Sequence, residues 1–184
     1  MSAALRWMSS DKLPLKTDFD VGVRGLGPPD VFARLRGRED WSLAQDTLFR
    51  FSQTFRYGTE SQGRSISDFA LEHVLGESTV ARLSSAYEYD QQNNLNGMVW
   101  AQGVSLSHVL GDTRTLSYGV TVNGHMKPDW RSDNKGPWVV WRSGFLRDWL
   151  FYEVEPRLTW YNTEQRWEAV WSLTLRLEVQ FGRK

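Results

Sequence analysis

The sequence predicts an all-β chain that forms a closed antiparallel up-and-down β-barrel of about ten strands, with eight to twelve possible. Apolar and polar residues alternate with a period of two along most of the chain, which is the pattern of strands with two different faces. The alternating segments run roughly 10–14 residues, whereas strands of globular proteins average about 5–6. The 184 residues suit a single domain over 1–184, in which residues 1–18 add a strand, plug the bore or stay loose.

The final segment shows the alternation most clearly. One of its faces is wholly apolar and the other is mostly polar, and the three- and four-residue spacing of a helical stripe cannot produce this. The apolar face holds Trp167, Ala169, Trp171, Leu173, Leu175, Leu177, Val179 and Phe181. The segment is therefore predicted to be one long strand.

Nine further segments are predicted to be strands. The clearest are residues 49–57, 115–123 and 150–160, and weaker alternation covers 64–75, 78–90, 97–109 and 137–146. Two short candidates, Phe19–Leu26 and Val31–Gly37, flank a turn at Gly27-Pro28-Pro29. Ten is an even number, so both chain ends are expected on the same side of the barrel.

Short turns are predicted at one end of these hairpins and longer polar connections at the other. The short turns are Leu75–Ser78, Leu110–Thr113 and Leu146–Trp149, with a looser relative at Arg38–Trp41. The longer connections are Gly58–Arg64, Gln91–Gly97, Lys127–Pro137 and Tyr161–Arg166. Short periplasmic turns with longer outer loops are the layout of an outer-membrane barrel.

The polar faces of the predicted strands carry arginine and carboxylate groups in near balance. Of the 22 basic residues 17 are Arg, and no Lys lies between Lys16 and Lys127. Because a guanidinium group binds carboxylates bidentately, we interpret the set as an ion-pair network in the lumen, with the apolar faces turned to lipid. The predicted lumenal network consists of Arg24, Arg34, Arg36, Arg50, Arg56, Asp68, Glu72, Arg82, Glu88, Arg142, Glu153, Glu155, Arg157, Arg176 and Glu178.

Composition supports a membrane barrel and excludes other classes. Tyr and Trp gather toward the ends of predicted strands, where membrane proteins have an interfacial aromatic belt. No apolar run approaches the ~20 residues of a membrane-spanning helix. The formal net charge of +0 gives no case for nucleic acid as a partner, and zero cysteines exclude disulfides and cysteine-ligated zinc. No export signal is visible after Met1, so we expect that one has been removed.

The closing stretch, from Trp149 to Gly182, resembles the C-terminal hairpin of bacterial outer-membrane β-barrel proteins. More narrowly, it is similar to a group of uncharacterised barrels from Gram-negative bacteria. In the wider class the last strand is amphipathic, ends in Phe and is read by the barrel assembly machinery. Here Leu175, Leu177, Val179 and Phe181 match that assembly signal, although Gly182-Arg183-Lys184 follow the aromatic residue and the usual glycine is absent. The resemblance implies a porin-like protein in the cell outer membrane, with lipid and the assembly machinery as partners, and implies no activity.

The sequence offers little catalytic chemistry. His73 and His108 occupy equivalent points of a repeated turn on the apolar register, which favours an interfacial role. His125 lies in the lumenal register before a loop with Asp129 and Asp133, where a histidine and a carboxylate could activate water. No nucleophile, metal or phosphate-binding motif accompanies it. We therefore expect no cofactor, no metal site and no enzyme.

Three functional hypotheses follow. The first is an integral outer-membrane barrel that is structural, docks an unidentified protein partner or forms a narrow channel with a charge-filled lumen. The second is a hydrolase at the outer rim, with His125, Asp129, Asp133 and Asp90 as its residues. The third is a soluble barrel that binds a hydrophobic ligand, in a pocket lined by Leu173, Leu175, Leu177 and Phe51.

Overall fold

The computed structural model describes residues 2–8, 16–24, 30–92, 97–145, 147–163 and 166–179. The side chains of residues 2–8, 24 and 147–149 are outside the description. None of the described residues form a helix long and apolar enough to cross a membrane. The strands are β1 (Ser2–Met8), β2 (Lys16–Arg24), β3 (Asp30–Ala44), β4 (Thr47–Gly58), β5 (Gln62–Gly76), β6 (Thr79–Asp90), β7 (Met98–Val109), β8 (Arg114–His125), β9 (Arg131–Phe145), β10 (Arg147–Thr163) and β11 (Arg166–Val179).

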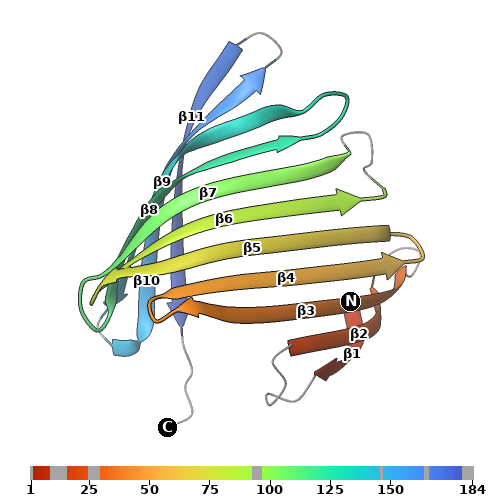
Figure 1. Ribbon diagram of the computed structural model, residues 1–184, viewed down its shortest axis with the longest axis horizontal. Helices are drawn as coiled ribbons and strands as arrows, with labels where there is room; N and C mark the ends of the chain where they lie inside the picture. The colour runs from red at the N-terminus through yellow and green to blue at the C-terminus, as the bar shows by residue number, and fades with distance from the viewer. Residues whose placement is uncertain are drawn as a thin grey trace. The chain divides into compact units, whose positions relative to one another are not determined.

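These strands form one sheet in which each strand pairs with its neighbours in the chain (Figure 1). The pairs β1–β2, β2–β3, β3–β4, β9–β10 and β10–β11 are all antiparallel. The prediction of an all-β, antiparallel, up-and-down chain is confirmed. The ten predicted strands correspond to β2–β11, and β1 is the additional strand that the sequence left open for residues 1–18.

The chain divides into two compact units. One comprises residues 1–71, 84–101 and 124–131, and the other comprises 72–83, 102–123 and 132–184. Each of the strands β5 to β9 contributes residues to both units. The units are therefore not successive segments, and the single barrel domain over 1–184 stays a prediction.

The predicted turn at Arg38–Trp41 is wrong, because β3 continues through it to Ala44 and the chain turns at residues 45–46. Arg38 and Asp40 belong to the polar face of the strand, whereas Glu39 is opposite Phe51 on the other face. Arg38 and Asp40 form an ion pair at 3.0 Å, and Asp40 also binds Arg50 at 3.1 Å. Trp41 stacks on Phe49 across the hairpin, with ring centroids 5.4 Å apart.

Two other boundaries are also corrected. The connection predicted over Lys127–Pro137 is shorter, because β9 begins at Arg131. Of the turn predicted at Leu146–Trp149, residues 147–149 belong to β10, which begins at Arg147. The register between β9 and β10 shifts between Arg147 and Phe151. The Gly27-Pro28-Pro29 turn lies outside the described residues, between β2 and β3.

Burial in the described part of the chain is the reverse of that in a water-soluble domain. The only hydrophobic residues buried there are Ala70 and Trp100, whereas Asp20, Asp30 and Ser143 are buried polar residues. Among the described residues, thirty-one large hydrophobic side chains are exposed, far more than the scattered few that a soluble surface carries. These residues therefore do not form a conventional hydrophobic core.

Close approach between β9 and β10 depends on Gly136. A Cβ atom at this position would clash with the carbonyl oxygen of Leu158 on the facing strand. We predict that Gly136→Ala disturbs the β9–β10 pairing and lowers the midpoint of urea unfolding in detergent. Gly76→Ala is the matched control, because a Cβ there meets nothing within 4 Å. Equal unfolding midpoints for the two variants would contradict the proposed close approach.

Candidate functional site

Strand register in the first unit sorts the side chains of β2, β3 and β4 onto two faces. Residues directly opposite each other in antiparallel pairs lie on the same face. Asp20 is opposite Arg34, and Arg34 is opposite Arg56. One residue along, Phe19 is opposite Leu35, and Leu35 is opposite Phe55. One face of these strands is thus ionic, and the other is apolar.

The apolar face is exposed. Phe19, Leu35 and Phe55 are 41%, 47% and 53% exposed. On the ionic face Asp20 is only 3% exposed, whereas the side chain of its partner Arg34 is 38% exposed. Aromatic contacts continue this face across β4 and β5, where the Phe51 and Phe69 rings lie 5.0 Å apart. The segregation of charge and apolar groups predicted from the alternation is thus present in this unit.

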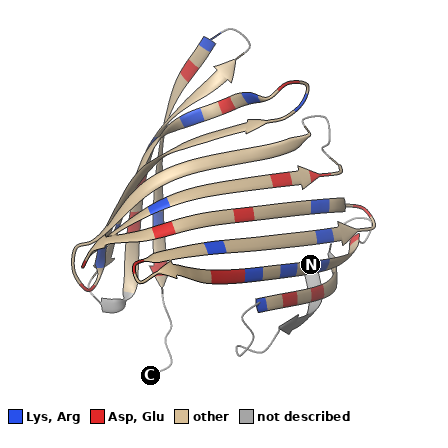
Figure 2. Ribbon diagram, viewed as in Figure 1, with Lys and Arg blue, Asp and Glu red and all other residues tan. Residues whose placement is uncertain are grey.

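Ion pairs cover the ionic face of the first unit, and charged residues run along its strands as well as at their ends (Figure 2). Arg34 donates from Nε and Nη2 to Asp20. Arg64 binds Glu88 at 2.7 Å. Arg36 has no ion pair in the described part of the chain and donates only to the Thr54 hydroxyl, at 3.4 Å. Asp68 accepts from the Ser52 hydroxyl at 3.1 Å.

Asp30 binds a side chain and two backbone groups, and the sequence did not predict this role. Its carboxylate accepts from Arg56 Nη2 at 3.0 Å and from the backbone N–H groups of Glu60 and Ser61 at 3.0 and 3.2 Å. Gly58 leaves room for this arrangement, because a Cβ there would clash with the Asp30 carboxylate. Asp30 therefore anchors the β4–β5 connection to the start of β3, a role that its place after two prolines did not reveal.

The second unit has its own ion pairs on the corresponding face. Arg176 on β11 donates to Glu153 on β10 at 2.7 Å, and the two residues are directly opposite in register. Arg142 on β9 binds Glu178 at 3.0 Å, and its guanidinium lies 4.9 Å from the centre of the Phe151 ring.

Most residues of the predicted lumenal network thus form ion pairs, each within one of the two units. The pairs are Arg34–Asp20, Arg50–Asp40, Arg56–Asp30, Arg64–Glu88, Arg82–Glu72, Arg142–Glu178, Arg157–Glu155 and Arg176–Glu153. The side chain of Arg24 lies outside the described residues, as does Phe181 of the assembly signal. Leu175, Leu177 and Val179 of that signal lie on β11 and are exposed. Whether the ionic face lines a lumen stays a prediction.

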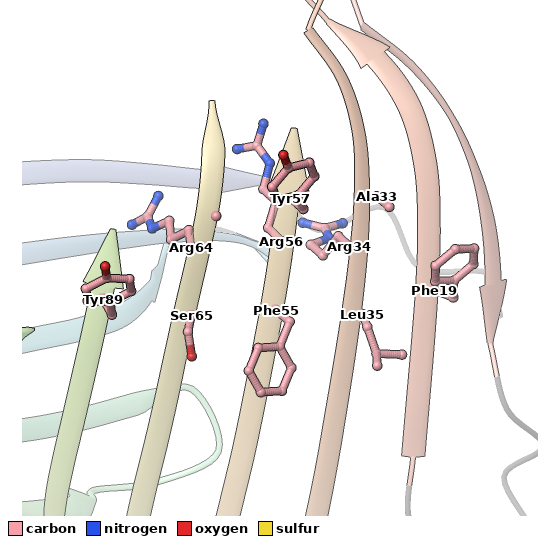
Figure 3. Close-up of a pocket in the computed structure, with 11 residues that line it drawn as sticks. Phe19, Ala33, Arg34, Leu35, Phe55, Arg56, Tyr57, Arg64, Ser65 and Tyr89 are labelled. Carbon is pink, nitrogen blue, oxygen red and sulfur yellow. The ribbon is translucent and has the colours of Figure 1, made fainter. Parts of the chain in front are cut away.

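A shallow apolar groove of about 410 Å³ lies on the apolar side of β2–β6 (Figure 3). It forms where the small residues Ala33 and Gly63 adjoin the rings of Phe55, Tyr57 and Tyr89. Phe55 and Tyr57 are 53% and 66% exposed, so the groove does not enclose a ligand. An apolar surface ending in tyrosines suits the boundary between lipid tails and headgroups.

Three of the residues proposed to line the pocket of a soluble, ligand-binding barrel lie on β11. Leu173, Leu175 and Leu177 are 63%, 71% and 68% exposed. They share one face of β11, opposite to the face that carries Arg176. Arg176 on that opposite face is itself 59% exposed, so the exposure of β11 does not distinguish its two faces, and the soluble ligand-binding barrel stays a hypothesis.

The three histidines lie on different strands, His73 on β5, His108 on β7 and His125 on β8. His108 binds the Thr79 hydroxyl through Nδ1 at 2.9 Å and the Tyr118 hydroxyl through Nε2 at 3.1 Å, and it stacks on the Tyr118 ring. His125 is the last residue of β8. Within the described ranges, no three histidine or acidic side chains gather closely enough to hold a metal ion. The absence of an enzyme activity stays a prediction.

No family model and no curated protein matches the sequence. Among solved structures, the chain is similar to the KdgM porin (7% identity, TM-score 0.59), with 98% of this chain and 92% of that one covered. It is also similar to the NanC porin (8% identity, TM-score 0.61, 98% and 93% covered). The chain has a porin-like fold. A third match, a bacterial polysaccharide outer membrane secretin, gives 12% identity and a TM-score of 0.64, with 98% and 70% covered. The expected similarity to outer-membrane β-barrels is confirmed at the level of the fold.

The ion pairs differ in burial, and their contributions to stability should differ accordingly. We predict that Asp30→Ala lowers the free energy of unfolding by about 3–5 kcal/mol, because it removes the carboxylate that binds the largely covered Arg56 and leaves two backbone N–H donors without this acceptor. The side chains of Asp30 and Arg56 are 9% and 17% exposed.

Arg82→Ala is the comparison. Its side chain is 48% exposed, so loss of its pair with Glu72 should cost at most about 1 kcal/mol. Urea unfolding of both variants in the same detergent measures the difference. A larger loss for Arg82→Ala than for Asp30→Ala would overturn this ranking.

Proposed function

We propose that the chain is an integral outer-membrane β-barrel that acts as a narrow, charge-lined channel. The observation that carries the proposal is the reversed burial of the described residues, in which many leucine, valine and aromatic side chains are exposed while Asp20 and Asp30 are buried. A bilayer is the solvent in which such a surface is stable, because the lipid tails cover the apolar face. The porin-like fold supports the same location.

The strand lengths support a membrane-spanning role. A tilted transmembrane strand needs about 9–11 residues. The strands β3 to β11 have 12 to 17 residues, and β2 has nine. With seven residues, β1 is too short to cross by the same measure.

A channel is favoured over a purely structural barrel because the ionic face keeps polar groups accessible. Arg34, Arg38 and Arg64 are 38%, 45% and 41% exposed even while they hold their carboxylates. About ten strands enclose only a narrow bore, so side chains on that face would contact any solute that passes. The fold of the two porins supports this choice.

Closure of the sheet is part of the proposal. In an up-and-down sheet β1 and β11 run in the same direction, so eleven strands cannot close with every pair antiparallel. Bacterial single-chain barrels have an even number of antiparallel strands, and an open strand edge in lipid would leave its N–H and C=O groups unpaired. We therefore propose that β2 and β11 pair in the membrane, which gives ten strands, with β1 displaced from the edge of β2.

Insertion by the barrel assembly machinery is proposed with the same fold. Leu175, Leu177 and Val179 lie on one exposed face of the last strand. These side chains are therefore accessible to the assembly machinery before β11 pairs with another strand.

Extraction and conductance test the proposed function. We expect the protein to leave the membrane only with detergent, to migrate differently on a gel before and after heating, and to give discrete current steps in a planar bilayer. A protein that stays monodisperse in plain buffer would contradict the membrane assignment. A heat-modifiable barrel without current would leave a structural barrel in place of the channel.

Cysteine pairs test the closure, since the chain has no native cysteine. We expect Val21→Cys on β2 to form a disulfide with one of Trp171→Cys, Leu173→Cys or Leu175→Cys on β11, all on the apolar register. The competing pair is Leu5→Cys with Val21→Cys, which are direct partners in the β1–β2 register. A disulfide only in the competing pair, read on a non-reducing gel of the membrane-inserted protein, would refute closure through β2.

A further inference from the structure

The ionic face of the first unit contains a hollow of about 370 Å³ that is rich in arginine. Five arginines line it, Arg34, Arg36, Arg38, Arg56 and Arg64, together with the hydroxyls of Ser52 and Thr54. Its only acidic lining residue is Asp68. We call this set the arginine hollow.

The carboxylates that pair with these arginines are not lining residues of the hollow. Arg34, Arg38, Arg56 and Arg64 bind Asp20, Asp40, Asp30 and Glu88 respectively. A guanidinium group has five N–H donors, and each of these pairs uses only some of them. The acids therefore hold the arginines in place without covering the cationic side that meets the hollow.

Arg36 differs from its neighbours. Its one recorded bond in the described part of the chain is the donation from Nε to the Thr54 hydroxyl at 3.4 Å, a neutral acceptor at a long distance. The residue is exposed, so the remaining donors of its guanidinium are accessible from the hollow. They suit a carboxylate, phosphate or sulfate group, whose oxygens match the planar fork.

Acids lie opposite the arginines of β3 on one side only. On β2, Asp20 and Asp18 are opposite Arg34 and Arg36, whereas on β4 the opposite residues are Arg56 and Thr54. Arg34 is directly opposite Arg56 in the β3–β4 register, and like charges in opposite positions destabilise a sheet. Arg34, Arg36 and Arg38 also follow one another on the same face of β3. In the second unit, by contrast, Glu153 is directly opposite both Arg142 and Arg176, an arrangement that stabilises the pairing of neighbouring strands. Across β3 and β4 the residues opposite Arg34 and Arg36 are not carboxylates, so the clustered arginines point to a ligand of opposite charge.

We infer that the arginine hollow binds anionic solutes that carry a carboxylate, phosphate or sulfate group, and that it makes the channel prefer anions. The second half of this inference rests on the proposed channel function, whereas the binding itself does not. Arg36 supplies the open bidentate donor, and Ser52 and Thr54 flank it with hydroxyl groups. The paired arginines contribute positive potential along the path.

Two measurements separate the two halves. In a planar bilayer with a KCl gradient, we expect a reversal potential that reports chloride preference, and a smaller preference in Arg36→Gln. Arg157→Gln is the matched control, because it removes the same charge from the corresponding face of β10, where Arg157 pairs with Glu155 at 2.7 Å. Its selectivity should stay close to that of the unaltered protein. An equal loss in both variants would mean that net charge alone sets the selectivity and would overturn a dedicated site.

The second measurement is the effect of inorganic phosphate on the melting temperature in detergent, against chloride of equal ionic strength. We expect phosphate to stabilise the unaltered protein, and its apparent affinity to fall about tenfold in Arg36→Gln, in line with loss of charge-assisted hydrogen bonds. Arg36→Lys keeps the charge without the planar fork, so it should retain ion preference but weaken phosphate binding. Heat-modifiability shows whether each variant is folded.

The outcomes are distinguishable. Current without anion preference, together with no phosphate effect, would overturn the anion site and leave the channel. Phosphate stabilisation that Arg36→Gln weakens, without current, would support the site and remove the channel. A phosphate effect unchanged in Arg36→Gln and Arg36→Lys would refute the assignment to the arginine hollow.

Discussion

Side-chain alternation along extended strands, combined with full pairing of the backbone, is the constraint on which this structure depends. Each residue along a strand points to the face opposite its neighbour, so one sheet presents an apolar and an ionic surface. In water the apolar surface would need a second layer to cover it. The described residues supply none, with Ala70 and Trp100 as their only buried hydrophobic side chains. The proposed membrane location supplies that layer, because lipid tails would contact the apolar surface.

The ionic face is built in two ways. In the second unit, opposite charges face each other across β9, β10 and β11, as with Glu153 between Arg142 and Arg176. This holds neighbouring strands together. In the first unit the acids Asp20, Asp30 and Glu88 bind the arginines without lining the arginine hollow. The same residue types thus stabilise one part of the sheet and concentrate positive charge in another, and only the register distinguishes the two arrangements.

Similarity to porins at 7–8% identity has a physical basis. A lipid-facing position accepts any sufficiently apolar side chain, and an up-and-down sheet requires only a period of two and turns at suitable intervals. Individual residues can therefore diverge almost completely while the pattern persists. For the same reason the fold does not identify the solute. Anion binding is inferred from the positions of particular arginines.

The sequence by itself determined the strands, their order and their two faces, because a period of two over ten or more residues has no other regular solution. It also predicted that arginine and carboxylate side chains pair on one face, but it did not predict which residue pairs with which. The tertiary structure decided the register, which shows that Arg38 and Asp40 continue β3 instead of turning, that Asp30 anchors the β4–β5 connection, and that Arg34 lies opposite Arg56. These contacts join residues 2 to 31 positions apart. Shifting a strand by two residues leaves the alternation of its faces unchanged, so the sequence pattern alone does not fix which residues are opposite each other. Register therefore had to come from packing and hydrogen bonding.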